Sequence, residues 1–390
     1  MPVIDADTIR KLIIVNDVLF VPDRITEAIG QTVVSSVKDV SDEISRLVAL
    51  YKQYIKHDGP TPVSYSSDTT IDAYTVHYLP RSTLIPKLLF LSLAYHPAFQ
   101  TIKDEVNILD LGSGTGGVVL GLLDLFKDKP FSDIKANITS CEISKLALDR
   151  QKELITRTKY QHGNIRHLCI DVADIQTYDK VLSKLAPYDY IIAANLLTEL
   201  PLDDIKSLLS KLPTIMAPNA VLLFADPPRA YVDKLKIYIS EILRSLGLFH
   251  YYPCPPGYEC QKSKCQWVWL SFEFTCPDIE INGELLETNQ LLSTTWSIFC
   301  SSNYSIYDVL QQIDTSLTWG VAAPIGSEFS LKERLNYSLC TAGGTRKVTH
   351  TRKRTFFLDR AEVILRGSIL GFNDDFSKVC IWHPVYGLEQ

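Results

Sequence analysis

Three acidic residues each close a short apolar segment that the sequence pattern predicts to be a strand. Asp110 stands just before the stretch GSGTGG, Glu142 ends the next apolar segment, and Asp171 follows the third. Parallel strands bring their carboxyl ends to one edge of a sheet, so the three carboxylates are expected to share a crevice. Ionised carboxylates accept hydrogen bonds from hydroxyl and ammonium groups. We therefore predict a crevice that binds a ligand rich in such donors.

The glycine loop in NILDLGSGTGG predicts how this ligand is held. Its glycines let the backbone turn tightly and approach a ligand at the start of the next helix. The spacing also fits a dinucleotide fingerprint, so a dinucleotide site, or no ligand, is the alternative. Asp110 favours S-adenosylmethionine, because the dinucleotide fingerprint usually has an apolar residue there. Glu142 would then accept the ribose hydroxyls, and Asp171 would lie near the adenine. The predicted cofactor-binding residues are Asp110, Gly112, Gly114, Gly116, Glu142, Asp171, Val172 and Asn195.

Asn195 and Glu199 follow the fourth predicted strand in AANLLTELP, near the expected position of a methyl acceptor. They are the candidate catalytic residues. The chain lacks the Asn/Asp-Pro-Pro-aromatic turn typical of amino methyltransferases at this point, and it shows no strand-four cysteine or evident general base. Methyl transfer to an already nucleophilic atom can proceed by proximity alone. The sequence therefore leaves open whether methyl transfer occurs.

The apolar pattern divides the chain into three parts. Residues 1–100 have the three- and four-residue spacing of helices. Residues 101–275 alternate short strands with helices, which predicts a parallel sheet covered on both faces, and residues 276–390 suggest a small β-barrel, OB-like in kind. The predicted fold class is α/β, a class I Rossmann-like methyltransferase domain with an N-terminal helical region and a C-terminal barrel. The expected strands of the sheet are Asn107–Leu111, Ile138–Glu142, Ile165–Ile170, Tyr188–Ala194 and Ala220–Ala225, followed by LFHYY and WVWLSFEF.

A proline-rich loop at residues 253–266 carries Cys254, Cys260 and Cys265. Its prolines and glycine keep it out of helix and strand, so its thiolates could converge on a metal. The spacings are wider than those of most zinc ribbons. Iron–sulfur clusters take four cysteines, often three from one loop and one from far away. Cys340 is the predicted fourth ligand, because it precedes a glycine turn. Structural zinc and unrelated thiols are the alternatives.

The chain has a formal net charge of −6, yet residues 334–358 contain no acidic residue. A local basic face on an acidic protein suits docking onto phosphate. A solvated hairpin with basic side chains is the alternative interpretation. The candidate RNA-binding residues are Arg346, Lys347, Arg352, Lys353 and Arg354.

The order of DAYTVHYLPRSTLIPKLL, NILDLGSGTGG, NLLTEL, the cysteine loop and SLCTAGG resembles the mitochondrial small-ribosomal-subunit assembly methyltransferase-like family, over residues 70–380. The resemblance implies a four-iron, four-sulfur cluster on the four cysteines named above, and a C-terminal barrel that docks on small-subunit ribosomal RNA. It also implies that Tyr78 and Arg81 pack over the cofactor crevice. One departure is Gln261, since the family has a proline after the second loop cysteine.

These patterns give a first functional hypothesis and two competitors. The first is an S-adenosylmethionine-binding, iron–sulfur protein that binds small-subunit ribosomal RNA and supports ribosome assembly or translation. The competitors are a methyltransferase of a protein or small molecule with structural zinc, and a non-catalytic assembly factor. We expect no membrane span, because the longest apolar stretch is broken by Pro86 and Lys87 and is too short to cross a bilayer. We expect no cleaved signal, because the N-terminus has neither a secretory nor a mitochondrial pattern. The nine cysteines are expected to be reduced. The expected compartment is the mitochondrial matrix in a eukaryote and the cytoplasm in a prokaryote.

Overall fold

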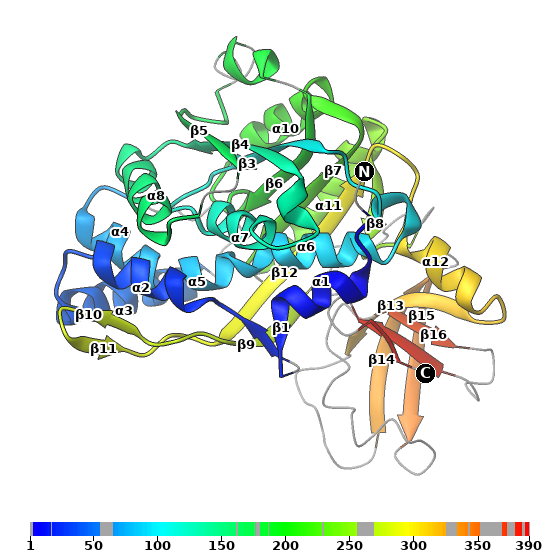
Figure 1. The fold of residues 1–390 in the computed structure, drawn as a ribbon. Helices are drawn as coiled ribbons and strands as arrows, with labels where there is room; N and C mark the ends of the chain where they lie inside the picture. Colours follow the sequence, from blue (N-terminus) through cyan, green and yellow to red (C-terminus); the bar gives the residue numbers. More distant parts are fainter. Residues whose placement is uncertain are drawn as a thin grey trace.

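The structure is a computed structural model, and it describes residues 3–16, 18–54, 65–160, 163–174, 176, 180–185, 187–227, 230–255, 269–324, 334–341, 344–351, 369–372, 379–383 and 387–389. A mixed sheet with helices on its faces forms its centre, and a separate antiparallel sheet lies at one side (Figure 1). Among the residues that the structure describes, no helix is both long and apolar enough to cross a bilayer.

The parallel part of the central sheet confirms the predicted α/β class. Its strands are β3 (Glu105–Leu111), β4 (Lys135–Glu142), β5 (Asn164–Cys169), β6 (Tyr188–Ala194) and β7 (Met216–Asp226), in the order β5-β4-β3-β6-β7. Buried apolar side chains fill both faces of β3, β4, β6 and β7, as expected for a sheet covered on both sides, whereas the side chains of the edge strand β5 are exposed or half-buried. The helices that follow them are α7 (Gly117–Phe126), α8 (Lys145–Thr158), α10 (Leu202–Lys211) and α11 (Ala230–Ser245). The order reverses at β3, which creates a crevice at the carboxyl ends of β3 and β6.

The antiparallel end of the sheet differs from the prediction. We expected WVWLSFEF to follow LFHYY as the last strand, but β12 (Leu291–Cys300) is the strand that pairs with β7. β8 (Phe249–Tyr252) and β9 (Trp269–Thr275) both pair with the other edge of β12. The reason is the length of β12, whose two halves each accept one partner. β12 lies in the range 276–390 that we assigned to the C-terminal domain, yet it belongs to the central sheet.

The N-terminal region is mainly helical, and it also extends the sheet. β2 (Val18–Phe20) pairs in parallel with β9, and β1 (Ile14–Val15) pairs with β2. All side chains of α6 (Leu84–Ala94) are buried, because it packs between α1 and α7. The other helices here are α1 (Ala6–Ile13), α2 (Asp23–Thr32), α3 (Val37–Tyr54), α4 (Asp68–His77) and α5 (Leu79–Ser82). Short 3-10 turns are η1 (Pro97–Phe99), η2 (Phe131–Asp133), η3 (Leu182–Lys184) and η4 (Leu212–Thr214).

The C-terminal sheet is antiparallel, in the order β15-β14-β13-β16-β17-β18. Trp382 packs its ring against Tyr95 and Tyr252, with centroids 5.4 and 5.5 Å apart, and so attaches this sheet to the rest of the protein. Its strands are β13 (Thr318–Pro324), β14 (Arg334–Thr341), β15 (Gly344–Thr351), β16 (Ile369–Phe372), β17 (Val379–His383) and β18 (Gly387–Glu389). α12 (Ile306–Ile313) precedes it, and β10 (Ile279–Ile281) forms a hairpin with β11 (Glu284–Leu286). Whether the sheet closes into a barrel stays a prediction.

Candidate functional site

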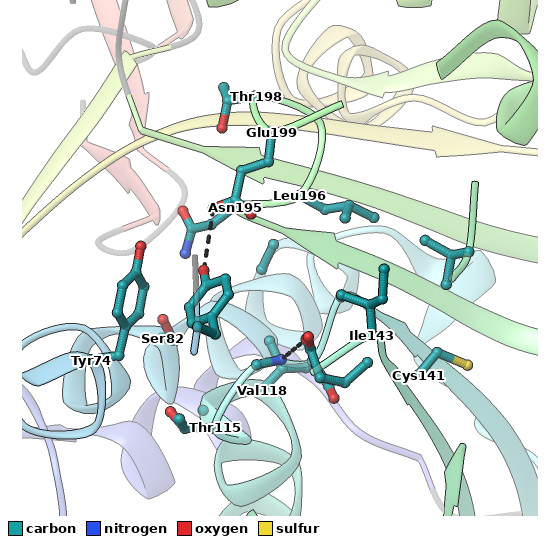
Figure 2. A pocket seen from close by; sticks show the side chains of 18 of the residues that line it. Tyr74, Ser82, Thr115, Val118, Cys141, Ile143, Asn195, Leu196, Thr198 and Glu199 are labelled. Atoms are coloured by element: carbon teal, nitrogen blue, oxygen red, sulfur yellow. Dashed lines mark hydrogen bonds between the residues drawn. The ribbon is translucent and has the colours of Figure 1, made fainter. Parts of the chain in front are cut away.

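A cavity of about 560 Å³ lies at the carboxyl ends of the parallel strands, where the predicted residues meet. Figure 2 shows Asn195, Thr198 and Glu199 along one wall, with Tyr74 and Ser82 of the N-terminal helices nearby. The volume suits a ligand of nucleoside size. The lining includes Tyr51, Tyr65, Tyr74, Tyr78, Ser82, Gly112, Gly114, Gly117, Glu142, Ile143, Asp171, Val172, Asn195, Leu196, Thr198, Glu199 and Asp204.

The glycine loop forms the floor of the cavity between β3 and α7. Gly112 and Gly114 have positive φ angles, +67° and +54°, which residues with a Cβ adopt at a cost. The amide of Ser113 donates to the carbonyl of Cys141 over 2.9 Å and ties the loop to β4. Gly116 is the N-cap of α7 and lies outside the lining, whereas Gly117 is part of it. The loop therefore presents backbone directly to a ligand.

Asp110 is buried beneath this loop, with 1% of its surface exposed, and it is not among the residues that line the cavity. Neither of its carboxylate oxygens has a hydrogen-bond partner among the residues that the structure describes. Burial raises the pKa of Asp110 well above its usual range, and the nearby Glu142 raises it further. Buried carboxylates are normally paired, because an unpaired one costs a large desolvation free energy. Both oxygens of Asp110 could therefore accept a hydrogen bond from a further donor.

Glu142 ends β4 and holds the loop in place. Its Oε2 accepts from the amide of Gly114 and its Oε1 from the amide of Ser144, both over 2.8 Å. Burial raises the pKa of Glu142, and these amide donors oppose the shift. A carboxylate oxygen has two lone pairs, so each oxygen can still accept a ligand hydroxyl. The predicted role at a ribose is compatible with this geometry.

The other predicted residues surround the same cavity. Asp171 and Val172 line it beyond β5, and Asp171 Oδ1 accepts from the amide of Ala173 over 2.9 Å. Asn195 follows β6 with φ +61°, and its backbone N–H donates to the carbonyl of Ala225 over 2.7 Å. The left-handed backbone is one that asparagine tolerates better than most residues. This backbone conformation turns the chain after β6, and the segment that follows, including Glu199, lines the cavity.

Tyrosines from the N-terminal region were missed by the sequence prediction, except for Tyr78. Tyr65 donates its hydroxyl to Glu199 Oε1 over 3.3 Å, and its carbonyl accepts from the hydroxyl of Ser144. Its ring meets that of Tyr74, with centroids 4.7 Å apart, and Tyr74 meets Tyr78 at 4.8 Å. The i, i+4 spacing of the last two was the available signal. Arg81 also lies in this region, with its guanidinium 5.3 Å from the Tyr78 ring centroid.

The structure places two of the four predicted metal ligands. Cys254 follows β8 and is half-buried, and Cys340 is buried in β14. Burial raises the pKa of Tyr307 well above its usual range, and charges on Cys254, Tyr252 and Cys340 add to the shift. The hydroxyl of Tyr307 donates to the carbonyl of Pro253, the residue before Cys254, over 2.7 Å. Among the described residues there is no group of three or more metal-ligating side chains; Cys260 and Cys265 lie outside them.

The candidate RNA-binding residues fall mostly outside the described part of the chain. The backbones of Arg346 and Lys347 lie in β15, at one end of the strand order of the C-terminal sheet. Arg352, Lys353 and Arg354 lie outside the described residues. Phosphate docking stays a prediction.

Comparisons with known proteins agree with the fold. Residues 109–222 match the family model for a methyltransferase domain. A stretch of 189 residues is 28% identical to the Dictyostelium discoideum protein named "Probable polyketide synthase 27"; it covers 45% of this chain and only 7% of that protein.

Two solved structures are distantly similar. One is magnesium protoporphyrin IX methyltransferase from Synechocystis PCC 6803 with bound S-adenosylmethionine, at 11% identity and TM-score 0.35, covering 69% of this chain and 99% of that one. The other is a methyltransferase from Agrobacterium tumefaciens, at 17% identity and TM-score 0.34, covering 57% and 63%. These likenesses are too distant to assign a substrate. The strand order, the glycine loop and the matched family model together identify a methyltransferase domain of the S-adenosylmethionine-dependent class.

Proposed function

We propose that this protein binds S-adenosylmethionine in the crevice and transfers its methyl group to an acceptor held beside Glu199. The observation that carries the proposal is the buried carboxylate of Asp110 beneath the glycine loop, which has no hydrogen-bond partner in the described part of the chain. Burying this carboxylate costs desolvation free energy, which pairing with a cation would offset. The ammonium of the methionine moiety is such a cation.

The residues present fit this cofactor. Asp110 would face its ammonium, Glu142 its ribose hydroxyls, and Asp171 with Val172 its adenine. When bound, S-adenosylmethionine supplies an electrophilic methyl group next to a sulfonium. Asn195 and Glu199 would lie on the acceptor side, because they follow β6, which neighbours β3. Their part would be to hold the acceptor in line and to exclude water, which supplies rate by proximity.

The experiment for this function is transfer of tritiated methyl from S-adenosylmethionine to small ribosomal subunits, with their RNA and protein counted separately. We expect label in one fraction with the wild-type protein and none with Asp110→Ala. Label that persists in the Asp110→Ala variant would contradict the role of this carboxylate. If S-adenosylmethionine binds but neither fraction is labelled, the small subunit is not the acceptor, and the two competing hypotheses, a protein or small-molecule acceptor and a non-catalytic assembly factor, are favoured.

For the thiols, we propose a four-iron, four-sulfur cluster on Cys254, Cys260, Cys265 and Cys340. The support is that Cys254 follows β8 of the central sheet, where the carbonyl of the adjacent Pro253 accepts from the hydroxyl of Tyr307 over 2.7 Å, and that Cys340 lies buried in β14 of the C-terminal sheet. Such a cluster would join the central and C-terminal sheets and would serve structure rather than methyl transfer. Protein purified without oxygen should be brown and carry iron with acid-labile sulfide, and Cys340→Ala should remove the colour. One equivalent of zinc without iron would contradict this assignment.

We also propose the family role that the motifs imply: binding of small-subunit ribosomal RNA in support of ribosome assembly. The support is the acid-free segment 334–358, which belongs to an acidic chain. Neutralising Arg352, Lys353 and Arg354 should weaken RNA binding and reduce its dependence on salt. Unchanged binding and salt slope would favour a protein or small molecule as the acceptor. The compartment follows the partner: the mitochondrial matrix in a eukaryote, the cytoplasm in a prokaryote.

A further inference from the structure

The cavity that holds the proposed cofactor has a strongly one-sided charge. Glu142, Asp171, Glu199 and Asp204 line it, and no lysine or arginine does so among the residues that the structure describes. Asp110 adds a further carboxylate beneath the floor, and its charge couples to that of Glu142. S-adenosylmethionine carries a single net positive charge when bound. A surplus of negative charge therefore remains for the acceptor to meet.

The acceptor side of the cavity adds aromatic faces to this charge. Tyr51, Tyr65, Tyr74 and Tyr78 all line it, and they form one continuous cluster. The hydroxyls of Tyr51 and Tyr74 are hydrogen-bonded to each other, which fixes the orientation of the two rings. The faces of tyrosine rings attract cations within about 6 Å of the ring centroid. Packed rings next to a carboxylate are the usual arrangement for holding an alkylammonium or guanidinium group.

The contact between Tyr65 and Glu199 shows that Glu199 accepts a hydrogen bond at this wall of the cavity. The Tyr65 hydroxyl reaches across the cavity mouth and donates to Glu199 Oε1. Burial raises the pKa of Tyr65 well above its usual range, and the charges of Glu199, Tyr51 and Glu142 add to the shift. The field at this hydroxyl is therefore negative, from Glu142 at the end of β4 and Glu199 in the turn after β6. A positively charged N–H donor near this hydroxyl would be attracted by the two carboxylates, whereas the neutral phenol gains little from their charge.

We propose that the methyl acceptor is a cationic nitrogen group, an ammonium or a guanidinium, that binds between Glu199 and the rings of Tyr65 and Tyr74. The inference rests on the proposed methyl transfer and names the substrate class of that site. The same charges repel phosphate, so a phosphate-bearing acceptor is disfavoured at this wall. Any contact with RNA phosphates then belongs to another face of the protein.

The reaction balances with groups already present. The bound nitrogen first loses one proton, which Glu199 accepts directly or through water. The nitrogen lone pair then forms the new bond to the methyl carbon, and the carbon–sulfur bond breaks with its electron pair retained on sulfur. The positive charge moves from sulfur to nitrogen. No oxidant or reductant is required.

The test uses the full chain saturated with S-adenosylhomocysteine, whose binding is measured first. Three probes of equal length are then titrated and followed by saturation-transfer NMR: n-butylammonium, 1-butanol and n-butyl phosphate. We expect butylammonium to bind at least tenfold more tightly than butanol, and butyl phosphate not to bind. Glu199→Gln should abolish the preference for the cation. Asp203→Asn, which removes an exposed carboxylate of α10 outside the cavity lining, should preserve it.

A second pair of variants separates the rings from the carboxylate. Tyr74→Phe keeps the aromatic face, whereas Tyr74→Leu removes it and should weaken butylammonium binding about fivefold. Equal affinities for the ammonium and the alcohol, or a cation preference that survives Glu199→Gln, would overturn the proposal. If S-adenosylhomocysteine itself does not bind, the proposed function fails first. If it binds and the probes show no preference, only the acceptor class is wrong.

Discussion

Two buried carboxylates near the two ends of α7 have opposite surroundings. Asp110 lies under the glycine loop that leads into the helix and has no hydrogen-bond partner among the described residues. Asp124 lies toward the other end of the helix and is bound by Lys87, Lys127 and Tyr160, over 2.6, 2.8 and 2.6 Å. Both are at most 2% exposed. The difference teaches that burial does not distinguish the two carboxylates, whereas their partners do: Asp124 is neutralised within the fold, and Asp110 is the one that our proposal assigns to a ligand.

The pKa values express the same contrast. Burial opposes ionisation of Asp124, but the charges of Lys87 and Lys127 outweigh it and hold its pKa below the usual range. Burial raises the pKa of Asp110, and the neighbouring carboxylate adds to it. Asp124 therefore stabilises the fold, whereas Asp110 destabilises the ligand-free protein. In our proposal, the cost of burying Asp110 is offset when the cationic ligand binds.

The largest change in the free energy of unfolding is expected at Asp124. Asp124→Asn leaves Lys87 buried without its countercharge and should lower the free energy of unfolding by about 3–5 kcal/mol. Because the pKa of Asp124 is lowered in the folded state, its stabilisation is complete above its unfolded value of 3.8 and is lost as the pH falls through the folded value. Urea unfolding at several pH values measures both. Asp128→Asn, an exposed partner of Lys127, should cost less than about 1 kcal/mol. Equal losses for the two variants would remove the contrast.

A smaller effect is expected in the loop between the two carboxylates. A Cβ at Gly112 would lie 2.8 Å from Leu196 Cδ1, whereas a Cβ at Gly114 would meet nothing within 4 Å. Both positions have positive φ, so Gly114→Ala should cost about 1–2 kcal/mol through backbone strain alone. Gly112→Ala should cost more than Gly114→Ala in thermal unfolding, and it should also displace Leu196 from the cavity wall. Equal costs would mean that Leu196 moves aside freely.

The smallest effect has the opposite sign. Asp110→Asn should raise the free energy of unfolding of the ligand-free protein by about 1 kcal/mol at neutral pH, because the unpaired charge is gone. The folded pKa of Asp110 is raised, so its penalty is absent below the unfolded value of 3.8 and grows as the pH rises toward the folded value. The gain should therefore vanish in acid. Asp133→Asn, at an exposed carboxylate, should show no such gain. A loss of stability in Asp110→Asn would mean that this carboxylate has a structural role.

Local patterns predicted the strands and the glycine loop because the information lies within a few residues. The run ending at Asp110 reads as a buried strand followed by a turn, and β6 was predicted with its observed ends, Tyr188–Ala194. The carboxyl edge of a parallel sheet then follows from general topology. For this reason most of the predicted cofactor residues lie around one cavity, although Asp110 and Gly116 are not part of its lining.

Features that depend on distant pairing were not predictable in the same way. β12 has an apolar pattern that would suit either domain, and only its pairing with β7 decides its place. Tyr65 lies 134 positions before Glu199, its hydrogen-bond partner. Nothing in the sequence around Tyr65 shows that it closes over a crevice built from strands far along the chain.

The most direct measurement is a calorimetric titration of S-adenosylmethionine into the wild-type protein and into Asp110→Asn, between pH 5 and about 8. We predict one site in the wild-type protein, with affinity that weakens as the pH falls and Asp110 becomes protonated. In Asp110→Asn the affinity should be about 10- to 100-fold lower, the equivalent of one charge-assisted hydrogen bond, and the pH dependence should be lost. No binding to the wild-type protein, or equal affinity and pH dependence in the two proteins, would contradict the assignment of the crevice.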